Sequence, residues 1–402
     1  MTDMVCPFSN GLPTHRERPL DPPEIFGELR SDQPIAPMVF PDGHQGWVVT
    51  EYDLVREILT DSRFSSQAAL KHLAFPSNRA MGFDFEKDLP PGQFEHMDPP
   101  EHTRYRKLLT ADFTLRRMKQ LVPRIEEIAA ERVAAMRRQG PPADLVHDFS
   151  IPMSSQVICE LLGIPAEEQD RFEADSGKLL NLNTAPEEVM GAVGNLVGLL
   201  GRLAAQKMAE PADDLISRLV TSGEVNEAEL MGMLLLLLVA GHETTANMLS
   251  LGTYTLLREP EQLAKLRADE SLIEGAVEEL LRFLTIVHIG VQRIPTEDVE
   301  IRGVPVKAGQ AVLLHLPSAN RDPGRFPDPD RLDVTRRAIG HLTFSHGIHQ
   351  CLGQQLARLE LRVGYTTLLR EFPDLRLAVP VEEIPMRDNM TIYGVHKLPV
   401  EW

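Results

Sequence analysis

The residues best suited to chemistry lie in FSHGIHQCLG, residues 344–353, which run directly into a helical pattern beginning at Gln354. Cys351 in this stretch can be a buried thiol, one ligand of a zinc site, or the thiolate ligand of a redox metal. A zinc site usually needs four nitrogen or sulfur ligands at recognisable spacings, and the chain contains neither CxxC nor HExxH. His346, His349 and Cys351 would supply at most three ligands from one short loop, so zinc is disfavoured.

A cysteine directly before a helix favours iron chemistry. Free backbone N–H groups and the positive end of the helix dipole surround such a sulfur, which lowers the pKa of the thiol and favours the thiolate. Gly347 and Gly353 permit tight turns and the close approach of a flat cofactor, and Phe344 can cover the sulfur. The spacing F-x-x-G-x-H-x-C-x-G fixes five residue types within ten residues, so the pattern is highly specific.

A second group of candidate residues lies in AGHETT, residues 240–245, at the end of the longest apolar run. Ala240 and Gly241 remove side-chain bulk and leave room for a small ligand such as oxygen. Thr244 lies four residues after Ala240 on the same helix face, where its hydroxyl can donate to the Ala240 carbonyl and bend the helix. Glu243 and Thr244, an acid and an alcohol in an apolar helix, would make a proton path. Taken alone, the segment is explained as well by ordinary polarity at a helix end.

Three further sets of polar residues carry a weaker signal. Glu279 and Arg282 are three residues apart and can pair on one helix, which in most sequences gives a solvated pair. His102 and Arg106 are four residues apart and share a helix face, and Arg293 follows a predicted strand. For each of these residues alone, exposure at the surface is the default expectation.

The composition excludes several classes of function. The formal net charge of −18 and the aromatic content of 5% argue against nucleic acid and anionic membranes, because phosphate binding needs a basic surface. The three cysteines, Cys6, Cys159 and Cys351, are far apart and odd in number, which predicts a reducing cytoplasm. The first twenty residues resemble no signal peptide. The longest apolar run, residues 230–241, is shorter than the ~20 residues of a membrane-spanning helix.

These candidates must be positioned by a mainly helical chain with a small β region, which we predict to form a single domain over residues 1–402. Asp98-Pro99-Pro100-Glu101 is a helix start signal with Asp98 as the N-cap. Further helices are predicted at residues 121–138, 150–163, 167–180, 186–209, from about 212, 225–257, 271–284 and from 354. The helix at 225–257 would be roughly 50 Å long. Short strands are predicted beyond residue 285. A strand end that runs into a helix is predicted at 47–59, and a long loop is predicted at 64–95.

Together these motifs resemble those of the cytochrome P-450 superfamily. Its haem-thiolate loop is matched by Phe344, Gly347, His349, Cys351 and Gly353. Residues 240–245 resemble the oxygen-activating segment of its long central helix, and residues 279–282, ELLR, resemble its E-x-x-R motif. Ser345 and His346 depart from the pattern, in which glycine often follows the phenylalanine. The resemblance implies the cytochrome P-450 fold, with the long helix over the haem.

The resemblance also implies roles for individual residues. Cys351 would ligate the iron of haem b (iron protoporphyrin IX), and Glu243 and Thr244 would relay protons. The buried pair of Glu279 and Arg282 would tie to the segment around Arg336. The haem propionates would be bound by His102, Arg106, Arg293 and His349. Ala240 would contact the haem, and we expect the substrate pocket to include Leu236, Val239, Ala240, Ile289 and Ile392.

The implied function is that of a soluble bacterial monooxygenase that uses O2 to hydroxylate or epoxidise a hydrophobic small molecule. Segments such as DPPEHTRYR and HQCLGQQLARLEL are most similar to the actinobacterial branch that tailors antibiotics, macrolides and statins and attacks steroids and xenobiotics. No membrane anchor or flavodoxin-like domain is recognisable, so a monomeric, cytoplasmic enzyme is expected to take electrons from a ferredoxin and a ferredoxin reductase.

Two other functions stay open. A haem-based binding or sensing protein without turnover has no use for a proton relay at Glu243 and Thr244. In a peroxide-driven oxygenase this acid–alcohol pair is often replaced. The presence of both residues therefore favours the use of O2.

Residues 101–119 are locally basic in an otherwise acidic chain. They carry six basic side chains against two acidic ones, and Arg358 and Arg362 lie one turn apart on the helix after Cys351. In the resembling fold these helices flank the thiolate side of the haem, so we expect a basic docking patch for ferredoxin, with Arg106 reserved for a propionate. Steering by such a patch raises association rates and weakens with salt. The alternative is a scatter of solvated charges.

Overall fold

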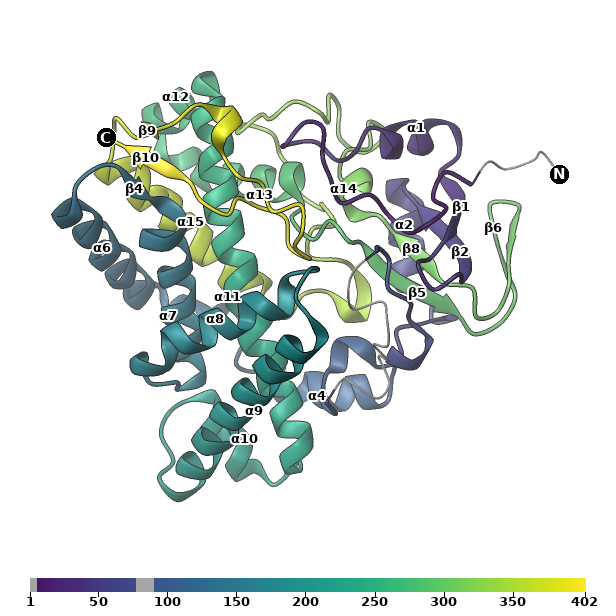
Figure 1. The fold of residues 1–402 in the computed structure, drawn as a ribbon, viewed down its shortest axis with the longest axis horizontal. Coiled ribbons are helices and arrows are strands. Elements are labelled where there is room, and N and C mark those ends of the chain that lie inside the picture. Colours follow the sequence, from purple (N-terminus) through teal and green to yellow (C-terminus); the bar gives the residue numbers. More distant parts are fainter. Residues whose placement is uncertain (1–5, 77–89) are drawn as a thin grey trace.

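The structure is a computed structural model that describes residues 6–76 and 90–402. It combines a large helical part with a smaller part built on a β-sheet (Figure 1). The helices are α1 (Ile25–Asp32), α2 (Tyr52–Thr60), α4 (Glu101–Thr110), α5 (Leu115–Gln120), α6 (Val122–Gln139), α7 (Ile151–Leu162), α8 (Gln169–Leu180), α9 (Pro186–Ala209), α10 (Leu215–Ser222), α11 (Glu227–Arg258), α12 (Pro260–Ala268), α13 (Ile273–Leu284), α14 (Leu316–Ala319) and α15 (Gln354–Glu371).

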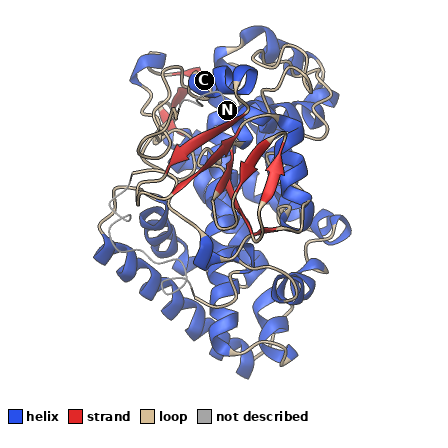
Figure 2. Cartoon of the chain, turned by 90° about the vertical axis from the view of Figure 1, so that its right-hand side faces the viewer, coloured by secondary structure: helices blue, strands red, loops and turns tan. Residues whose placement is uncertain are grey.

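The strands in the described part of the chain form one larger sheet and two small ones. They are β1 (Ile35–Val39), β2 (Gln45–Val49), β3 (Phe64–Ser65), β4 (Ala143–Asp144), β5 (Val291–Pro295), β6 (Val299–Ile301), β7 (Val304–Val306), β8 (Val312–Leu314), β9 (Arg376–Leu377) and β10 (Pro399–Glu401). The larger sheet has the order β1-β2-β8-β5-β3, so strands from distant parts of the sequence lie side by side (Figure 2). β2 and β8 pair in parallel, with Trp47 opposite Val312, and the other neighbours are antiparallel.

α11 runs through the helical part and carries the 240–245 segment (Figure 1). A capping box fixes its start: the Glu229 N–H donates to the Asn226 side chain, and the Asn226 N–H donates to the Glu229 carboxylate. Because α11 is apolar on nearly all sides, the largest hydrophobic core packs around it. By length and composition α9 and α11 could each cross a membrane. A buried core helix passes the same test, and the relevant window is 72% buried in α11 and 33% buried in α9.

The predicted fold class, mainly helical with a small β region, is confirmed. α9 spans the predicted range, and α6, α7, α8, α11 and α13 begin within a few residues of it. α1, α5, α12 and α14 were not predicted. The N-cap prediction at Asp98 is wrong, because Pro100 occupies that position of α4. The Asp98 carboxylate instead accepts hydrogen bonds from the Ser65 hydroxyl (2.6 Å) and the Ser66 N–H (2.7 Å). Of the loop predicted at 64–95, residues 77–89 lie outside the described residues.

Candidate functional site

A cavity of about 380 Å³ lies between the middle of α11 and the loop that precedes α15. Its walls are mostly apolar and come from α4, α7, α11, α15 and the loops around residues 94 and 351. The lining includes Arg106, Ala240, Gly241, Thr244, Phe344, His349, Cys351 and Gly353. Residues that the sequence placed on separate elements are therefore brought to one space.

The loop around Cys351 is held in shape by its own backbone. The Cys351 N–H donates to the Phe344 carbonyl oxygen (2.9 Å), and Gly347–His349 form a short 3-10 turn between them. Gly347 has a φ of 76°, and a Cβ there would lie 2.7 Å from the Leu59 carbonyl oxygen, so the position requires glycine. Ser345 has a φ of 60° where the family pattern often has glycine. A non-glycine residue held in this region costs about 1–3 kcal/mol.

The Cys351 sulfur opens into the cavity and is accessible from it, although protein atoms surround it on its other sides. Burial raises the pKa of this thiol, while the N–H groups of Gly353 and Gln354 and the Arg106 guanidinium act in the opposite direction. The lowered pKa predicted from the sequence is therefore wrong for the polypeptide alone, because burial outweighs the dipoles at the start of α15. A metal cation bound to the sulfur would supply the missing stabilisation of the thiolate.

On α11, Thr244 and Ala240 face the cavity together. The Thr244 hydroxyl donates a hydrogen bond to the Ala240 carbonyl oxygen (2.8 Å), the local bond that their spacing predicts. Gly241 also borders the cavity, but a Cβ there would lie 2.6 Å from the Ile158 side chain. Its missing side chain thus lets α7 pack closely on α11, whereas Ala240 is the residue that leaves room in the cavity.

Glu243 points elsewhere. Its carboxylate accepts a hydrogen bond from the Asn247 side-chain amide (2.8 Å) and pairs with Arg387 at 3.1 Å. It is buried and, unlike Thr244, does not appear in the lining of the cavity among the described residues. The acid and the alcohol are neighbours in sequence, but in this conformation they do not share the cavity.

Four basic residues gather at one end of the cavity. The rings of His102 and His349 lie 4.2 Å apart, and Arg293 and Arg106 lie close enough to lower the pKa of both. Burial is the larger cause, and it brings the pKa of His349 to about 2 and that of Arg293 to about 10. Asp98 is the acid that opposes these shifts at His102 and Arg293. Glu95, a further carboxyl in the cavity lining, has its pKa raised by burial to about 7, so it does not offset the buried basic groups, which call for an anion.

The residues fit a flat cofactor that carries two carboxylates. Among the described residues, both ring nitrogens of His102 and the Nη2 of Arg293 are buried without a hydrogen-bond partner. No described atom lies within 4 Å of a Cβ built on Gly353, which borders the cavity, so there is open space beside the thiol. The unpartnered donors match propionate oxygens, and the space beside Cys351 matches a porphyrin face.

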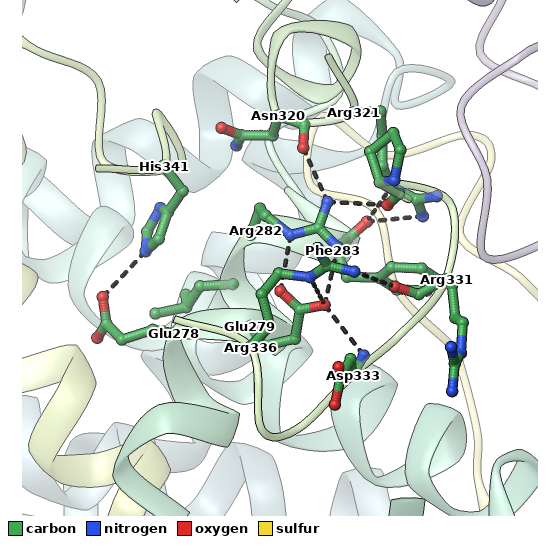
Figure 3. Close-up of polar contacts among 12 residues, drawn as sticks. Glu278, Glu279, Arg282, Phe283, Asn320, Arg321, Arg331, Asp333, Arg336 and His341 are labelled. Atoms are coloured by element: carbon green, nitrogen blue, oxygen red, sulfur yellow. Dashed lines mark hydrogen bonds and ion pairs between the residues drawn. The ribbon is translucent and has the colours of Figure 1, made fainter. Parts of the chain in front are cut away.

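Glu279 and Arg282 are completely buried and form the centre of a polar network (Figure 3). Their closest nitrogen–oxygen distance is 2.7 Å. Arg282 also donates to the carbonyl oxygens of Asn320 and Pro329 (both 2.9 Å), and Arg336 donates to Glu279 (3.0 Å). The network therefore joins α13 to the irregular segment that leads to the Cys351 loop, which the resemblance implied and the local spacing alone did not.

The expected substrate residues divide into two groups. Leu236 and Ala240 line the cavity, whereas Val239, Ile289 and Ile392 are not among its described lining residues. Ile392 is buried in the largest core, and Ile289 packs against a separate cluster beside the sheet. The cavity is also lined by Phe94, Phe113, Ile158, Leu237 and Leu356, which the sequence does not mark because their positions depend on how distant elements pack.

Glu360, on α15, is a buried carboxyl at the edge of the cavity that the sequence analysis did not single out. It is 1% exposed, and its Oε2 has no partner among the described residues. Burial raises the pKa of Glu360 well above its ordinary value, and the Ser154 hydroxyl on α7 opposes this shift only in part. An acid on an amphipathic helix normally faces water, so the sequence offers no signal for this burial.

Comparisons with known proteins place this geometry in context. The sequence profile of one family, Cytochrome P450, matches residues 203–401. Cytochrome P450-SU2 from Streptomyces griseolus is 49% identical over 384 residues, which cover 96% of this chain and 94% of that protein. Pentalenic acid synthase from Streptomyces avermitilis is 44% identical over 395 residues, 97% of each chain. Among solved structures, that of CYP105P1 in complex with filipin I superposes with a TM-score of 0.92 at 42% identity and covers 99% of both chains.

Proposed function

This chain belongs to the cytochrome P450 family, and from this premise we propose that it oxidises a hydrophobic natural product or xenobiotic. It is a haem-dependent monooxygenase. The observation that carries the proposal is a single, mostly apolar cavity lined by both Cys351 and Thr244. The names of two relatives, one a pentalenic acid synthase and one solved with filipin I, support a bulky apolar substrate. The candidate classes are macrolide-like polyketides, statins, steroids and xenobiotics.

Each residue of the site has a part in this proposal. Haem iron ligated by a thiolate supplies the activation of O2, because the thiolate pushes electron density toward the O–O bond. Cys351 would hold the iron of haem b, and His102, Arg106, Arg293 and His349 would hold its propionates. Thr244 would hold a proton at Oγ1 within the cavity, and Glu243 would supply that proton. Ala240 would leave room for O2 and substrate.

We propose one monomeric catalytic unit in the cytoplasm that takes electrons from a ferredoxin and its reductase. The test is turnover of a substrate panel by the haem-loaded enzyme, driven either by NADH with ferredoxin and reductase or by peroxide. Panel members that bind should shift the haem absorption from low to high spin, and product should form in the NADH-driven reaction. Spin shifts without product under either condition would indicate a binding protein.

Thr244→Ala is expected to uncouple electron use from product formation. The variant keeps the cavity but loses the hydroxyl that holds the proton. A positioned proton donor typically contributes about 10²–10⁴-fold to the rate of the step that it serves. Substrate affinity and NADH consumption should persist, while product per NADH falls at least about tenfold and peroxide accumulates. Thr244→Ser, which keeps the hydroxyl, is the control. An unchanged product yield in Thr244→Ala would remove Thr244 from the mechanism.

Ala240→Phe is expected to block large substrates while leaving the metal side of the cavity open. Ala240 faces the cavity, and a phenyl ring there would occupy space that a bulky substrate needs. Spin-state titration should show an affinity loss of at least about tenfold for the largest ligands. Even one mismatched methylene in a hydrophobic pocket changes the discrimination between substrates by about 10–200-fold. Binding of CO to the reduced enzyme should persist. Val239→Phe, beside the cavity lining, is the matched control.

Ion pairs neutralise several basic residues of the expected docking patch. Arg104 pairs with Glu229 (3.0 Å), Arg117 with Asp213 (3.4 Å) and Arg358 with Glu278 (2.6 Å). In the described part of the chain, the basic residues of the expected patch that form no ion pair are Lys107, Arg116, Lys119 and Arg362. α5, which carries Arg116 and Lys119, packs against α15, which carries Arg362. Leu115 and Ile348, 47% and 54% exposed, add apolar area nearby.

Charge reversal by Arg116→Glu with Lys119→Glu is therefore expected to slow electron transfer from ferredoxin. Electrostatic steering raises on-rates by about 10–10³-fold, so at low ionic strength the first-electron rate should fall about tenfold. Reduction by dithionite and substrate affinity should stay as in the wild type. Arg137→Glu with Arg138→Glu on α6 is a control with the same change of charge. A ferredoxin rate that is unchanged and independent of salt would exclude the patch.

A further inference from the structure

Arg16 is a buried cation that has no part in the proposed mechanism. It lies between His15 and Glu17, which are exposed, yet its own side chain turns inward and the residue is only 4% exposed. None of its three guanidinium nitrogens has a hydrogen-bond partner among the described residues. Burial lowers the pKa of Arg16 to about 10, so the group stays charged at pH 7. A buried charge without hydrogen bonds is strongly unfavourable unless another group compensates it.

The backbone on both sides of Arg16 fixes this inward direction. On one side, the Leu12 N–H donates to the Ala74 carbonyl oxygen (2.7 Å). On the other side, the Leu20 carbonyl oxygen accepts a hydrogen bond from the buried Arg321 (3.0 Å). The segment that carries Arg16 is thus attached to the rest of the protein before and after it. The burial of the guanidinium is therefore set by the fold.

The guanidinium lies against Tyr393 of the C-terminal hairpin, residues 386–395, whose two ends form an antiparallel bridge. The Arg16 Cζ is 3.7 Å from the centre of the Tyr393 ring, a cation–π contact. This contact engages the face of the guanidinium and leaves the N–H groups in its plane unused. Tyr393 is completely buried, and its hydroxyl also has no hydrogen-bond partner among the described residues. Burial raises the pKa of this hydroxyl, which therefore stays protonated and can donate.

The acids nearest in effect to Arg16 are paired with other cations. Asp388 and Asp21 are the carboxylates that attract its charge. Asp388 pairs with the exposed His15 (2.7 Å), and Asp21 pairs with Arg321 (3.2 Å). In the described part of the chain, neither acid forms a hydrogen bond with the Arg16 guanidinium. Their attraction thus acts without the direct contact that compensates a buried charge.

Other basic groups make the surroundings of Arg16 more positive. After burial, Arg321 is a cause that lowers the pKa of Arg16. Arg16 in turn lowers the pKa of His288 and His315, for which burial is again the largest cause. The pKa of His288 falls to about 3, so its imidazole is neutral at pH 7, and its Nε2 donates to the Met390 carbonyl oxygen (2.8 Å). These shifts indicate a positive potential, which favours a negative ligand.

We propose that the Arg16 guanidinium and the Tyr393 hydroxyl bind a small monovalent anion, either a halide or a simple carboxylate. Arg16 supplies one positive charge, and the enclosed position favours a small ion. Buried donors without partners also mark the propionate end of the cavity, where the carboxylates of the cofactor fit. Neither Arg16 nor Tyr393 is among the described lining residues of that cavity, so the two sites are distinct. The anion would join the segment around Arg16 to the hairpin.

The first arm of the test measures anion binding directly, in the haem-loaded enzyme. Chloride that exchanges with a protein site broadens the chloride NMR line, and the reduced, CO-bound state is diamagnetic, so the iron does not add to the broadening. The wild type should broaden the line, and Arg16→Gln should lose most of that effect. Arg18→Gln is the matched control in the same segment, because its side chain is 67% exposed and Asp21 keeps its pair with Arg321. Tyr393→Phe should weaken the affinity about tenfold.

The second arm measures the unfolding temperature at constant ionic strength, as chloride or formate replaces the bulky sulfonate isethionate. A ligand that binds only the folded state raises this temperature with its concentration. The rise should occur in the wild type and in Arg18→Gln and be lost in Arg16→Gln. Competition against chloride then identifies the source of the ligand. Stronger displacement by bromide than by formate indicates an inorganic halide, and the reverse indicates a carboxylate.

Several results would overturn the anion site. If neither chloride nor formate affects the wild type more than Arg16→Gln, the unpartnered donors bind only water. Should Arg16→Gln fail to fold, equal anion affinity in the wild type and in Tyr393→Phe overturns the site instead. Chloride binding that appears only in Asp388→Asn would show that Asp388 compensates Arg16 in solution. The inference goes beyond the proposed function and is independent of it, because both arms are measured without turnover.

Discussion

Cys351→Ser is expected to abolish the red-shifted ferrous–CO absorption band typical of a thiolate-ligated haem, together with all turnover. The sulfur borders the cavity, and its N–H bond to the Phe344 carbonyl fixes the loop that presents it. A serine hydroxyl keeps this geometry but stays protonated and cannot donate charge to iron as a thiolate does. Absorption spectra of the reduced, CO-saturated variant give the measurement.

The chain offers two matched controls for this substitution. Cys6 and Cys159 are the other cysteines, one exposed and one buried in the main core. Cys6→Ser and Cys159→Ser should both retain the red-shifted band, although the second removes an apolar contact from the core and should lower stability by about 1–2 kcal/mol. A red-shifted band that survives in Cys351→Ser would mean that another residue ligates the iron.

Glu279→Gln is expected to cost about 3–5 kcal/mol of stability, the usual cost of breaking a buried ion pair from one side. The substitution leaves Arg282, which is completely buried, without its anion and weakens the bond from Arg336 as well (Figure 3). Since Arg282 also holds the carbonyls of Asn320 and Pro329, the segment leading to the Cys351 loop should loosen. Urea unfolding, followed by far-UV circular dichroism and by haem absorption, measures both effects.

The neighbouring acid provides the control. Glu278 pairs with Arg358 and with His341, but its side chain and that of Arg358 are 20% and 27% exposed. Because both side chains of the Arg358 pair keep some contact with water, Glu278→Gln should cost less stability than Glu279→Gln. Equal losses in Glu278→Gln and Glu279→Gln would show that burial of the Glu279 network does not set its importance.

The sequence by itself determined the features that depend on neighbouring residues. The spacing of Phe344, Gly347 and Cys351 encodes a loop whose turns and hydrogen bond are internal to it. The bond from Thr244 to Ala240 follows from an i, i+4 relation on one helix. The long apolar run after Asn226 predicted α11 to within two residues at its start. These interactions are short in sequence, so residue type and spacing are enough to specify them.

Only the tertiary structure decided which charged groups are buried and where they point. The spacing of Glu279 and Arg282 alone predicts a solvated pair. In the structure the pair is bonded to Asn320, Pro329 and Arg336, which come from a distant segment. From its place in the sequence, Glu243 is expected to face the cavity. In the structure it points away and pairs with Arg387 of the C-terminal hairpin. The energy of a charge is set by its solvent exposure and its partners, and both come from elements that are distant in the sequence. The spacing of residues along one helix carries no information about those elements.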